Sequence, residues 1–204
     1  IRDCSQSRGL GDVYKRQNEN FVVLGLGRSG LASARALNAS FANVICWDDD
    51  PEKRNLASSQ GLRVIGSVSD FDWESVDRLI ISPGVPHHFP SPHPMVSAAV
   101  SAGVLIDNDV GLFFQSIATK SWDKFSVRPR IVAVTGSNGK STTASLLHHI
   151  FLKLGYKSQL AGNIGRGVLD IDPPENNELI VLELSSYQIE AVSYTHLRAH
   201  ETGY

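Results

Sequence analysis

The chain has 204 residues, of which 42% are hydrophobic and 20% charged, and its formal net charge at pH 7 is −2. This composition is typical of a globular protein, and the length suits one large or two small domains. The balanced charge, without a basic run, excludes the usual signature of a nucleic-acid or membrane-surface partner. The sequence has no apolar stretch near the roughly 20 residues of a spanning helix and no visible secretory signal. Of the two cysteines, Cys4 and Cys46, the second lies in an apolar run, so we expect a reduced, buried thiol and a cytoplasmic protein.

Both ends of the chain fit no structural pattern around them. Residues 1–17 and 192–204 resemble peptides that arise when sequencing-adapter DNA is translated at the edges of assembled fragments. We therefore expect both segments to pack poorly, and burial of Tyr14 or Leu197 in a common core would contradict this. His196 and His200 have the i, i+4 spacing of a zinc-binding pair, but without a third ligand we expect no metal site there.

The apolar pattern divides the remaining chain into two α/β units, residues 18–118 and 131–191, joined by a polar linker at 119–130. In the first unit, short apolar runs alternate with stretches of helical spacing. Its predicted strands are 21–24, 43–47, 62–65, 78–82 and 104–106. One predicted helix begins near Leu31, a second begins at Pro51, and a third covers 94–102. Strands alternating with helices imply right-handed crossovers, so we predict a Rossmann-like domain with a mainly parallel sheet.

A glycine-rich loop follows the first predicted strand. Gly25, Gly27 and Gly30 form the pattern G-x-G-x-x-G, and Asp48 ends the second predicted strand. In this pattern a diphosphate binds at the helix N-terminus and the acid binds a ribose hydroxyl. Plainer alternatives stay open, in which the glycines only make a close turn and Asp48 only caps the next segment. Residues 82–84 (Ser-Pro-Gly) either lie at the ligand-binding edge of the sheet or form an ordinary turn.

The second unit is predicted to be a P-loop ATPase-type α/β domain. Its predicted strands are 131–134, 156–160 and 179–184, and its helix covers 144–154. The expected packing face of that helix consists of Leu146, Leu147, Ile150, Phe151 and Leu154. Glu183 lies near the end of the last strand, where a carboxylate commonly completes magnesium binding, although an exposed strand-end acid is the plainer alternative. His148 and His149 are expected to be packing or surface residues.

The loop at 135–143 (TGSNGKSTT) lies between a predicted strand and a predicted helix. Its glycines let backbone N–H groups approach phosphate oxygens, and the helix N-terminus adds the positive end of its dipole. Lys140 supplies a charge for the outer phosphates, and the Ser141 hydroxyl is placed to bind magnesium. The standard spacing requires glycine at position 134, where this chain has Val134, so the loop is a shorter variant anchored on its two glycines.

These motifs together resemble the Mur ligases of peptidoglycan synthesis. The resemblance is carried by TGSNGKST, by GNIG at 162–165 and by ELSSYQIE at 183–190, in that order. With GLGRSG at 25–30 and SPG at 82–84, the chain is most similar to members that add D-glutamate to UDP-N-acetylmuramoyl-L-alanine. Members that add L-alanine to UDP-N-acetylmuramate are the nearest alternative. The family has three domains, for the uridine diphosphate substrate, for ATP and for the amino acid, and the resemblance over about 18–191 implies a truncated fragment.

The resemblance implies a site for each nucleotide, with the first loop binding the diphosphate of a nucleotide sugar and not NAD. The implied substrate-binding residues are Gly27, Arg28, Ser29, Asp48, Gly84, Asn163 and Ser185. The implied ATP-binding residues are Gly136, Ser137, Asn138, Gly139, Lys140, Ser141 and Thr142. Ser141 and Glu183 are the implied magnesium ligands, and Lys140, Asn163 and Glu183 the implied catalytic residues, with Asn163 where the substrate carboxylate meets the γ-phosphate.

The implied reaction is ATP-dependent, ADP-forming amide synthesis through an acyl phosphate, which the amine of D-glutamate then attacks. A downstream histidine, a modified lysine and the amino-acid domain of the family would follow residue 191, so we expect this fragment to be catalytically inactive. The resemblance implies that the whole enzyme is a monomer. Gly111 departs from the family, which usually has an acidic residue there.

Two other classes of function stay open. An NAD(P)-dependent oxidoreductase with an incidental Gly-Lys-Ser would explain the first loop alone. A non-enzymatic nucleotide-binding module would leave the segment around Glu183 without a purpose. The roles of His87, His88 and His93 are unassigned.

Overall fold

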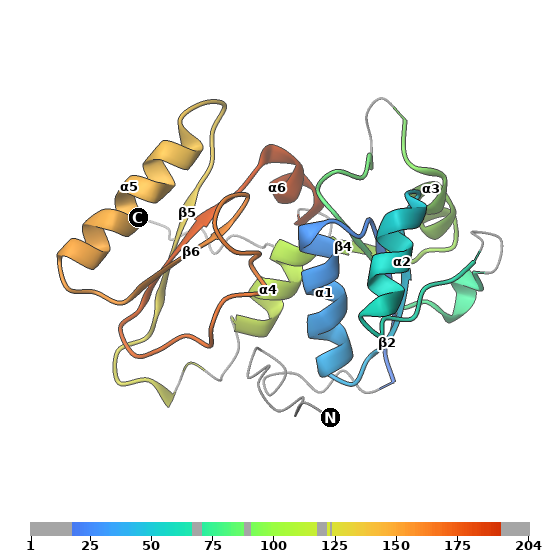
Figure 1. Ribbon diagram of the computed structural model, residues 1–204, viewed down its shortest axis with the longest axis horizontal. Helices are drawn as coiled ribbons and strands as arrows, with labels where there is room; N and C mark the ends of the chain where they lie inside the picture. The colour runs from blue at the N-terminus through green and yellow to red at the C-terminus, as the bar shows by residue number, and fades with distance from the viewer. Residues whose placement is uncertain (1–17, 67–70, 88–90, 118–121, 123, 193–204) are drawn as a thin grey trace.

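The computed structural model describes residues 18–66, 71–87, 91–117, 122 and 124–192 (Figure 1). Two α/β units, each built on a parallel sheet, lie side by side (Figure 1). This arrangement confirms the α/β class predicted from the sequence. The predictions about Cys4, Tyr14, His88, His196, Leu197 and His200 lie outside the described residues.

The first unit winds in both directions from its first strand. Its strands are β1 (Asn20–Leu24), β2 (Asn43–Trp47), β3 (Arg78–Ile81) and β4 (Leu105–Asn108), in the spatial order β2-β1-β3-β4. Its helices are α1 (Arg28–Ala39), α2 (Pro51–Ser59), α3 (Pro94–Ser101) and α4 (Asp109–Ile117), with a 3-10 turn, η4 (Trp73–Ser75). The chain passes from β1 to β2 on one side and returns to β3 on the other. Open α/β sheets bind ligands outside the carboxyl ends of the strands at such a reversal.

Helices cover both faces of this first sheet, which explains why its strands are apolar without alternation. Successive side chains of β1 point to opposite faces. Phe21 and Val23 belong to the hydrophobic cluster that includes α1 and α4, whereas Val22 and Leu24 belong to the cluster that includes α3. The sheet is therefore the middle layer of the unit.

The predicted strand at 62–65 is wrong. Val64 makes a single isolated bridge to Cys46, with hydrogen bonds from the Cys46 N–H to the Arg63 carbonyl (2.8 Å) and from the Ile65 N–H to the Cys46 carbonyl (3.4 Å). The apolar run is short and ends at Gly66, so it borders β2 over one residue pair without forming a strand.

Cys46 is fully buried in β2. Burial raises the pKa of its thiol to about 12, because the charged thiolate loses its hydration inside the core. The prediction of a buried thiol is confirmed.

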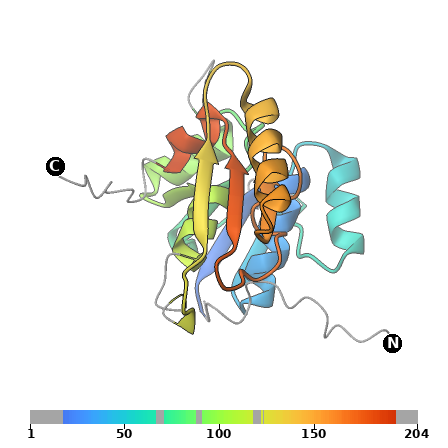
Figure 2. The ribbon, with the colours of Figure 1, turned by 90° about the vertical axis from the view of Figure 1, so that its left-hand side faces the viewer.

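The second unit has three parallel strands, β5 (Arg130–Val134), β6 (Ser158–Gly162) and β7 (Leu179–Glu183), in the order β5-β7-β6. Helix α5 (Lys140–Lys153) lies on one side of this sheet, and α6 (Ser186–Val192) follows β7 (Figure 2). Strand β6 begins two residues later than predicted. The reason is that Tyr156 still donates its N–H to the Phe151 carbonyl, completing the end of α5 before the chain extends.

Helix α5 packs with only part of the face that the apolar spacing predicted. The exposed members of the predicted face are Leu146, Ile150 and Leu154. Ala144 is buried, and Leu147 and Phe151 are half-buried. His148 completes this inward stripe, with its Nδ1 2.9 Å from the Ser158 hydroxyl on β6. A polar residue with a hydrogen-bond partner can occupy the packing face, so counting apolar residues alone predicted it only in part.

One hydrophobic cluster extends across both units. Ala32 on α1 and Phe113 on α4 belong to the same cluster as Val168, Ile171 and Leu182 of the second unit. The two sheets therefore share a core, and α1 and α4 lie between them (Figure 1).

Gly111, the departure from the family pattern, has a local explanation. A Cβ at this position would lie 1.8 Å from Oδ1 of Asp107, which is fully buried. Asp107 also accepts a hydrogen bond from the Gln115 side chain (2.7 Å) and lies 3.5 Å from the Arg78 guanidinium. A side chain at 111 is incompatible with this placement of Asp107.

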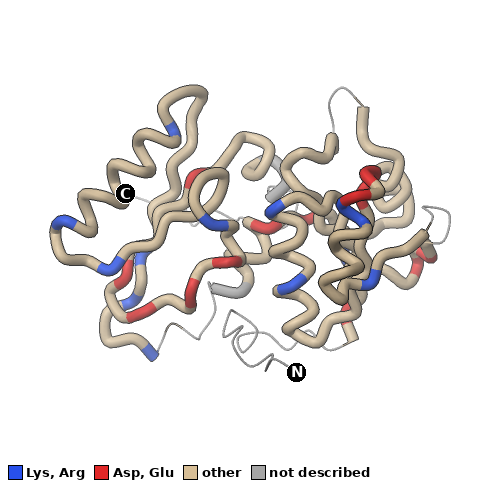
Figure 3. The backbone as a smooth tube through the Cα atoms, in the orientation of Figure 1, with Lys and Arg blue, Asp and Glu red and all other residues tan. Residues whose placement is uncertain are grey.

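Charged residues of both signs are interspersed along both units (Figure 3). Among the residues that the structure describes, none of the helices combines the length and the apolar character needed to cross a bilayer.

Candidate functional site

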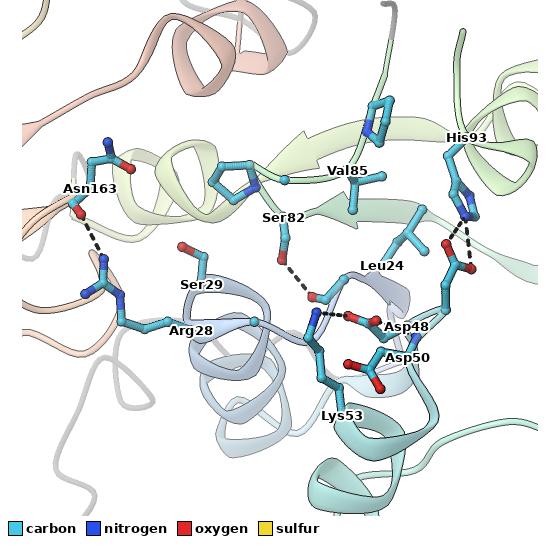
Figure 4. Close-up of a pocket in the computed structure, with 16 residues that line it drawn as sticks. Leu24, Arg28, Ser29, Asp48, Asp50, Lys53, Ser82, Val85, His93 and Asn163 are labelled. Atoms are coloured by element: carbon cyan, nitrogen blue, oxygen red, sulfur yellow. Dashed lines mark hydrogen bonds and ion pairs between the residues drawn. The ribbon is translucent and has the colours of Figure 1, made fainter. Parts of the chain in front are cut away.

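A pocket of about 540 Å³ opens at the carboxyl ends of β1, β2 and β3 (Figure 4). Its walls come from the loops that follow these three strands, and Asn163 of the second unit completes one side. The pocket therefore occupies the reversal point of the first sheet, where ligand binding is expected for this architecture.

The loop after β1 is held in a tight turn by its neighbours. The Gly25 N–H donates to the Trp47 carbonyl (2.8 Å), and the Ser82 hydroxyl donates to the Gly25 carbonyl (2.7 Å). A Cβ on Gly30 would lie 1.8 Å from the Gly25 carbonyl oxygen. Glycine at position 30 is thus what lets α1 begin so close to β1, and the same turn lines the pocket.

Asp48 holds this loop with both of its carboxylate oxygens. Oδ2 accepts from the Leu26 N–H (2.6 Å) and Oδ1 from the Asp50 N–H (2.9 Å). Lys53 places its ammonium 3.6 Å from Oδ2. The carboxylate is buried and borders the pocket, so its first role is to fix the loops after β1 and β2.

The N-terminus of α1 faces the pocket as a site of positive potential. Gly27 is the N-cap and provides no capping side chain, and the first turn contains no acidic residue. Arg28 and Ser29 follow it and line the pocket. Among the described residues, Arg28 forms no ion pair with a carboxylate. Free N–H groups, the helix dipole and a guanidinium together suit an anion such as a diphosphate.

The second glycine-rich loop leads from β5 into α5 and is exposed. Gly139 is the N-cap of α5 with φ +75°, a left-handed conformation that favours glycine. The Lys140 ammonium donates to the carbonyls of Gly136 (2.7 Å) and Ser137 (3.2 Å). Lys140 is therefore folded over its own loop, with its charge held beside the helix N-terminus.

Glu183 lies at the same edge of the second sheet as this loop, because it pairs with Val134 in register. Its side chain is buried, which excludes the alternative of an exposed strand-end acid. Oε1 accepts a long hydrogen bond from the Asn163 amide (3.4 Å), and the buried Oε2 has no hydrogen-bond partner in the described part of the chain. An orphaned buried carboxylate oxygen fits a hard cation such as Mg²⁺.

A metal ion at this edge would have few protein ligands. The described residues contain no group of three or more His, Cys, Asp or Glu side chains that could hold one. Ser141, the second residue of α5, is exposed and carries the other predicted ligand oxygen. Glu183, Ser141, phosphate oxygens and water are a donor set of the kind that magnesium accepts, since this ion usually keeps several waters.

Comparison with known proteins decides the family. The model of the Mur ligase MurD-like N-terminal domain matches residues 19–107, and that of the Mur ligase middle domain matches residues 134–200. The chain belongs to the Mur ligase family.

The relatives within the Mur ligase family are similar over most of this chain. It is 55% identical over 174 residues to a UDP-N-acetylmuramoylalanine--D-glutamate ligase of Cereibacter sphaeroides, covering 85% of this chain and 37% of the relative. A ligase of the same name from Roseobacter denitrificans is 56% identical over 171 residues, covering 83% and 36%. The chain thus spans little more than a third of the length of these curated relatives.

Among solved structures, a UDP-N-acetylmuramate:L-alanyl-gamma-D-glutamyl-meso-diaminopimelate ligase from Neisseria meningitides aligns over 81% of this chain and 52% of its own. The TM-score is 0.46 and the identity 17%, a similarity too low to support a conclusion about this chain.

The structure brings most of the predicted substrate residues of this Mur ligase chain to one pocket. Those that line it are Gly27, Arg28, Ser29, Asp48, Gly84 and Asn163. Ser185 is not among the lining residues. Its hydroxyl donates to Oε1 of Gln188 (3.2 Å) and accepts from the Gln188 N–H (3.2 Å), so it is engaged at the start of α6.

Sequence reasoning missed four polar residues of the pocket, Asp49, Asp50, Lys53 and His93. His93 caps α3, because its Nδ1 accepts from the Met95 N–H (3.1 Å), and its Nε2 lies 3.1 Å from Oδ2 of Asp49. The position of His93 just before Pro94, at the start of a predicted helix, could have indicated its capping role. Nothing in the local sequence indicated that it lines the pocket. The ring of His87 makes an edge contact with that of Tyr187, at 6.4 Å between centroids.

Proposed function

We propose that this chain is the nucleotide-sugar-binding and ATP-binding part of an enzyme that joins D-glutamate to UDP-N-acetylmuramoyl-L-alanine in peptidoglycan synthesis. The observation that carries the proposal is the presence of both nucleotide loops in one chain, with Asn163 bordering the first site and hydrogen-bonded to Glu183 beside the second. The names of the relatives support this choice of amino acid and nucleotide sugar.

In this proposal, residues 18–118 bind the nucleotide sugar, 119–130 link the units and 131–191 bind ATP. The uridine diphosphate occupies the pocket, with its phosphates at the N-terminus of α1 beside Arg28 and Ser29. Asp48 keeps the receiving loop in shape by accepting from the Leu26 N–H. Because the loop is already formed, little ordering cost opposes binding.

ATP binds in this proposal along residues 136–142. Lys140 exchanges its bonds to the Gly136 and Ser137 carbonyls for phosphate oxygens, which are stronger partners because they carry charge. Ser141 and Glu183 hold magnesium, which, when bound, neutralises the negative charge that gathers on the phosphoryl oxygens.

The chemistry has two steps. A carboxylate oxygen of the nucleotide sugar takes the γ-phosphoryl group of ATP, and ADP leaves. The amine of D-glutamate then attacks the carbonyl carbon of the acyl phosphate, inorganic phosphate leaves with the bonding electron pair, and the nitrogen loses a proton. Asn163 borders the pocket and contacts Glu183, so its amide is suited to orient the carboxylate toward the phosphoryl group. The remainder of the relatives' length would supply the amino-acid site, and we propose that the whole enzyme is cytoplasmic and monomeric.

The test is calorimetric titration of this chain with UDP-N-acetylmuramoyl-L-alanine, with UDP-N-acetylmuramate and with NADH. We expect the first to bind, the second to bind more weakly and NADH to give no signal. Ser29→Asp is the matched variant, because an added carboxylate at the N-terminus of α1 repels a diphosphate, and it should weaken binding at least about tenfold.

Binding of NADH without response to uridine nucleotides would favour the oxidoreductase alternative. Preference for UDP-N-acetylmuramate, together with ligation of L-alanine by the full-length enzyme, would favour the L-alanine ligase instead.

A further inference from the structure

Arg28 lies in the first unit and donates hydrogen bonds to the second. Its guanidinium donates to the carbonyls of Asn163 (2.9 Å), Gly165 (3.2 Å) and Gly162 (3.4 Å), as Figure 4 shows for Asn163. The three acceptors are the last residue of β6 and two residues of the loop that follows it, more than 130 residues away in the sequence. The same guanidinium borders the pocket at the N-terminus of α1.

The loop after β6, whose carbonyls accept from Arg28, is also hydrogen-bonded to Glu183. The Asn163 N–H donates to the Glu183 carbonyl (2.9 Å), and the Asn163 amide side chain donates to its carboxylate (3.4 Å). At Gly162 a Cβ would lie 2.2 Å from the Glu183 carbonyl oxygen. The backbones of Gly162 and Glu183 are in close contact, so a shift of the loop displaces the Asn163 amide from the Glu183 carboxylate.

A second connection between the units runs through the start of α4. The buried carboxylate of Asp109, the first residue of α4, accepts from the Gln188 side-chain amide (3.5 Å) on α6. Asn108 donates its side-chain amide to the Gln188 carbonyl (2.7 Å). The junction of β4 and α4 therefore bonds to α6 of the second unit, beside the contact that Arg28 makes.

We infer that Arg28 is a positioning residue that couples occupancy of the nucleotide-sugar pocket to the Asn163–Glu183 pair of the second unit. The inference rests on the proposed function. A diphosphate at the N-terminus of α1 attracts the guanidinium and fixes it, and the fixed guanidinium holds the loop after β6. Each nucleotide then strengthens the binding of the other, because coupling between two sites is reciprocal.

The role requires arginine and not only a positive charge. A guanidinium presents a planar set of N–H donors that reaches three carbonyls at once, whereas an ammonium is a compact charge on a flexible stem. Arg28→Lys should therefore keep much of the attraction for a diphosphate but lose most of the hydrogen bonds to the carbonyls of residues 162, 163 and 165.

The experiment measures the affinity of the full-length ligase for a non-hydrolysable ATP analogue with magnesium, with and without saturating UDP-N-acetylmuramoyl-L-alanine. In the wild type we expect the nucleotide sugar to tighten analogue binding at least about fivefold. In Arg28→Lys and Arg28→Met this ratio should fall to within about twofold of one. Loss of a purely structural contact would weaken both states equally and leave the ratio unchanged.

Arg35→Leu is the matched control. Arg35 also lies on α1 and pairs with Asp170 of the second unit (3.2 Å), but it does not line the pocket. This variant should keep the wild-type ratio. A measurement that needs no substitution is amide exchange at residues 162–165, which should slow when the nucleotide sugar binds to the wild type.

The outcomes separate the two claims. If neither nucleotide binds the wild type, the proposed function fails and the coupling fails with it. The coupling alone is overturned if both nucleotides bind but Arg28→Lys keeps the wild-type ratio of analogue affinities with and without the nucleotide sugar. It is also overturned if the nucleotide sugar does not slow amide exchange at residues 162–165.

Discussion

The two glycine-rich loops of this molecule begin in the same way, after a parallel strand and before a helix, but they are built differently. The loop at 25–30 is enclosed by Trp47, Asp48 and Ser82, and a Cβ on Gly30 would overlap another part of the loop. In the loop at 135–139 every residue is exposed, and a Cβ on either glycine would meet nothing within 4 Å. The first loop has its shape imposed by its neighbours, whereas the second depends on its own backbone and on Lys140.

The largest effect should come from the exposed loop. Lys140→Ala in the full-length ligase removes the charge proposed to stabilise the transferring phosphoryl group, so ATP turnover should fall about 1,000-fold. Binding of the nucleotide sugar should stay within about twofold of wild type, because Lys140 does not line the pocket. Steady-state ADP release and calorimetric titration measure the two quantities, and retained turnover would refute the role of Lys140.

The enclosed loop should respond in stability. In Gly30→Val the new side chain collides with the Gly25 carbonyl, and the free energy of unfolding should fall by about 3 kcal/mol. Gly27→Ala is the control, since a Cβ there meets nothing within 4 Å and φ is −71°, and it should lose less than about 1 kcal/mol, the cost of alanine at an N-cap. Urea unfolding monitored by circular dichroism compares them. Equal losses in both variants would mean that the loop is not enclosed as described.

The smallest effect concerns Asp109, which is buried at the start of α4. Burial raises the pKa of its carboxyl, and hydrogen bonds from Ser29, Gln188 and the Val110 N–H lower it by less. The folded state therefore keeps a proton that the unfolded state releases near the ordinary value of 3.8. Stability falls as the pH rises from about 4 toward the folded pKa, because the unfolded state then binds fewer protons.

Asp109→Asn should abolish this decline, so the variant should gain stability relative to wild type between pH 4 and pH 7. Thermal unfolding at the two pH values measures it. Asp172→Asn serves as a control of opposite sign, because hydrogen bonding to Arg166 lowers the pKa of the exposed Asp172. A wild-type decline that persists in Asp109→Asn would assign it to another group.

The sequence predicted the elements whose signal is local. Short apolar runs located β1, β2, β3 and β7, and the strand-loop-helix order located both glycine-rich loops. The position of Glu183 at the end of β7 followed from the same reasoning, and its burial turns an ambiguous acid into a candidate ligand. Local sequence patterns predicted these strands and loops because each pattern lies within a single strand or loop.

Features that depend on distant partners escaped prediction. His93 meets Asp49 across 44 residues, and Arg28 meets Asn163 across 135, and neither pairing leaves a mark in local spacing. The packing face of α5 was only partly predicted, since His148 joins it through a hydrogen bond with Ser158, on a strand that comes later in the chain. Such contacts are fixed by how elements dock, which periodicity does not encode.

The order of strands in the second sheet has a consequence for synthesis on the ribosome. Strand β7 is the last of the three to be translated, yet it lies between β5 and β6 and pairs with both. Until residues 179–183 leave the exit tunnel, the earlier strands lack their hydrogen-bonding partner and expose unpaired edges. Nascent chains paused before this point should therefore be far more prone to chaperone capture or aggregation than chains paused just after it.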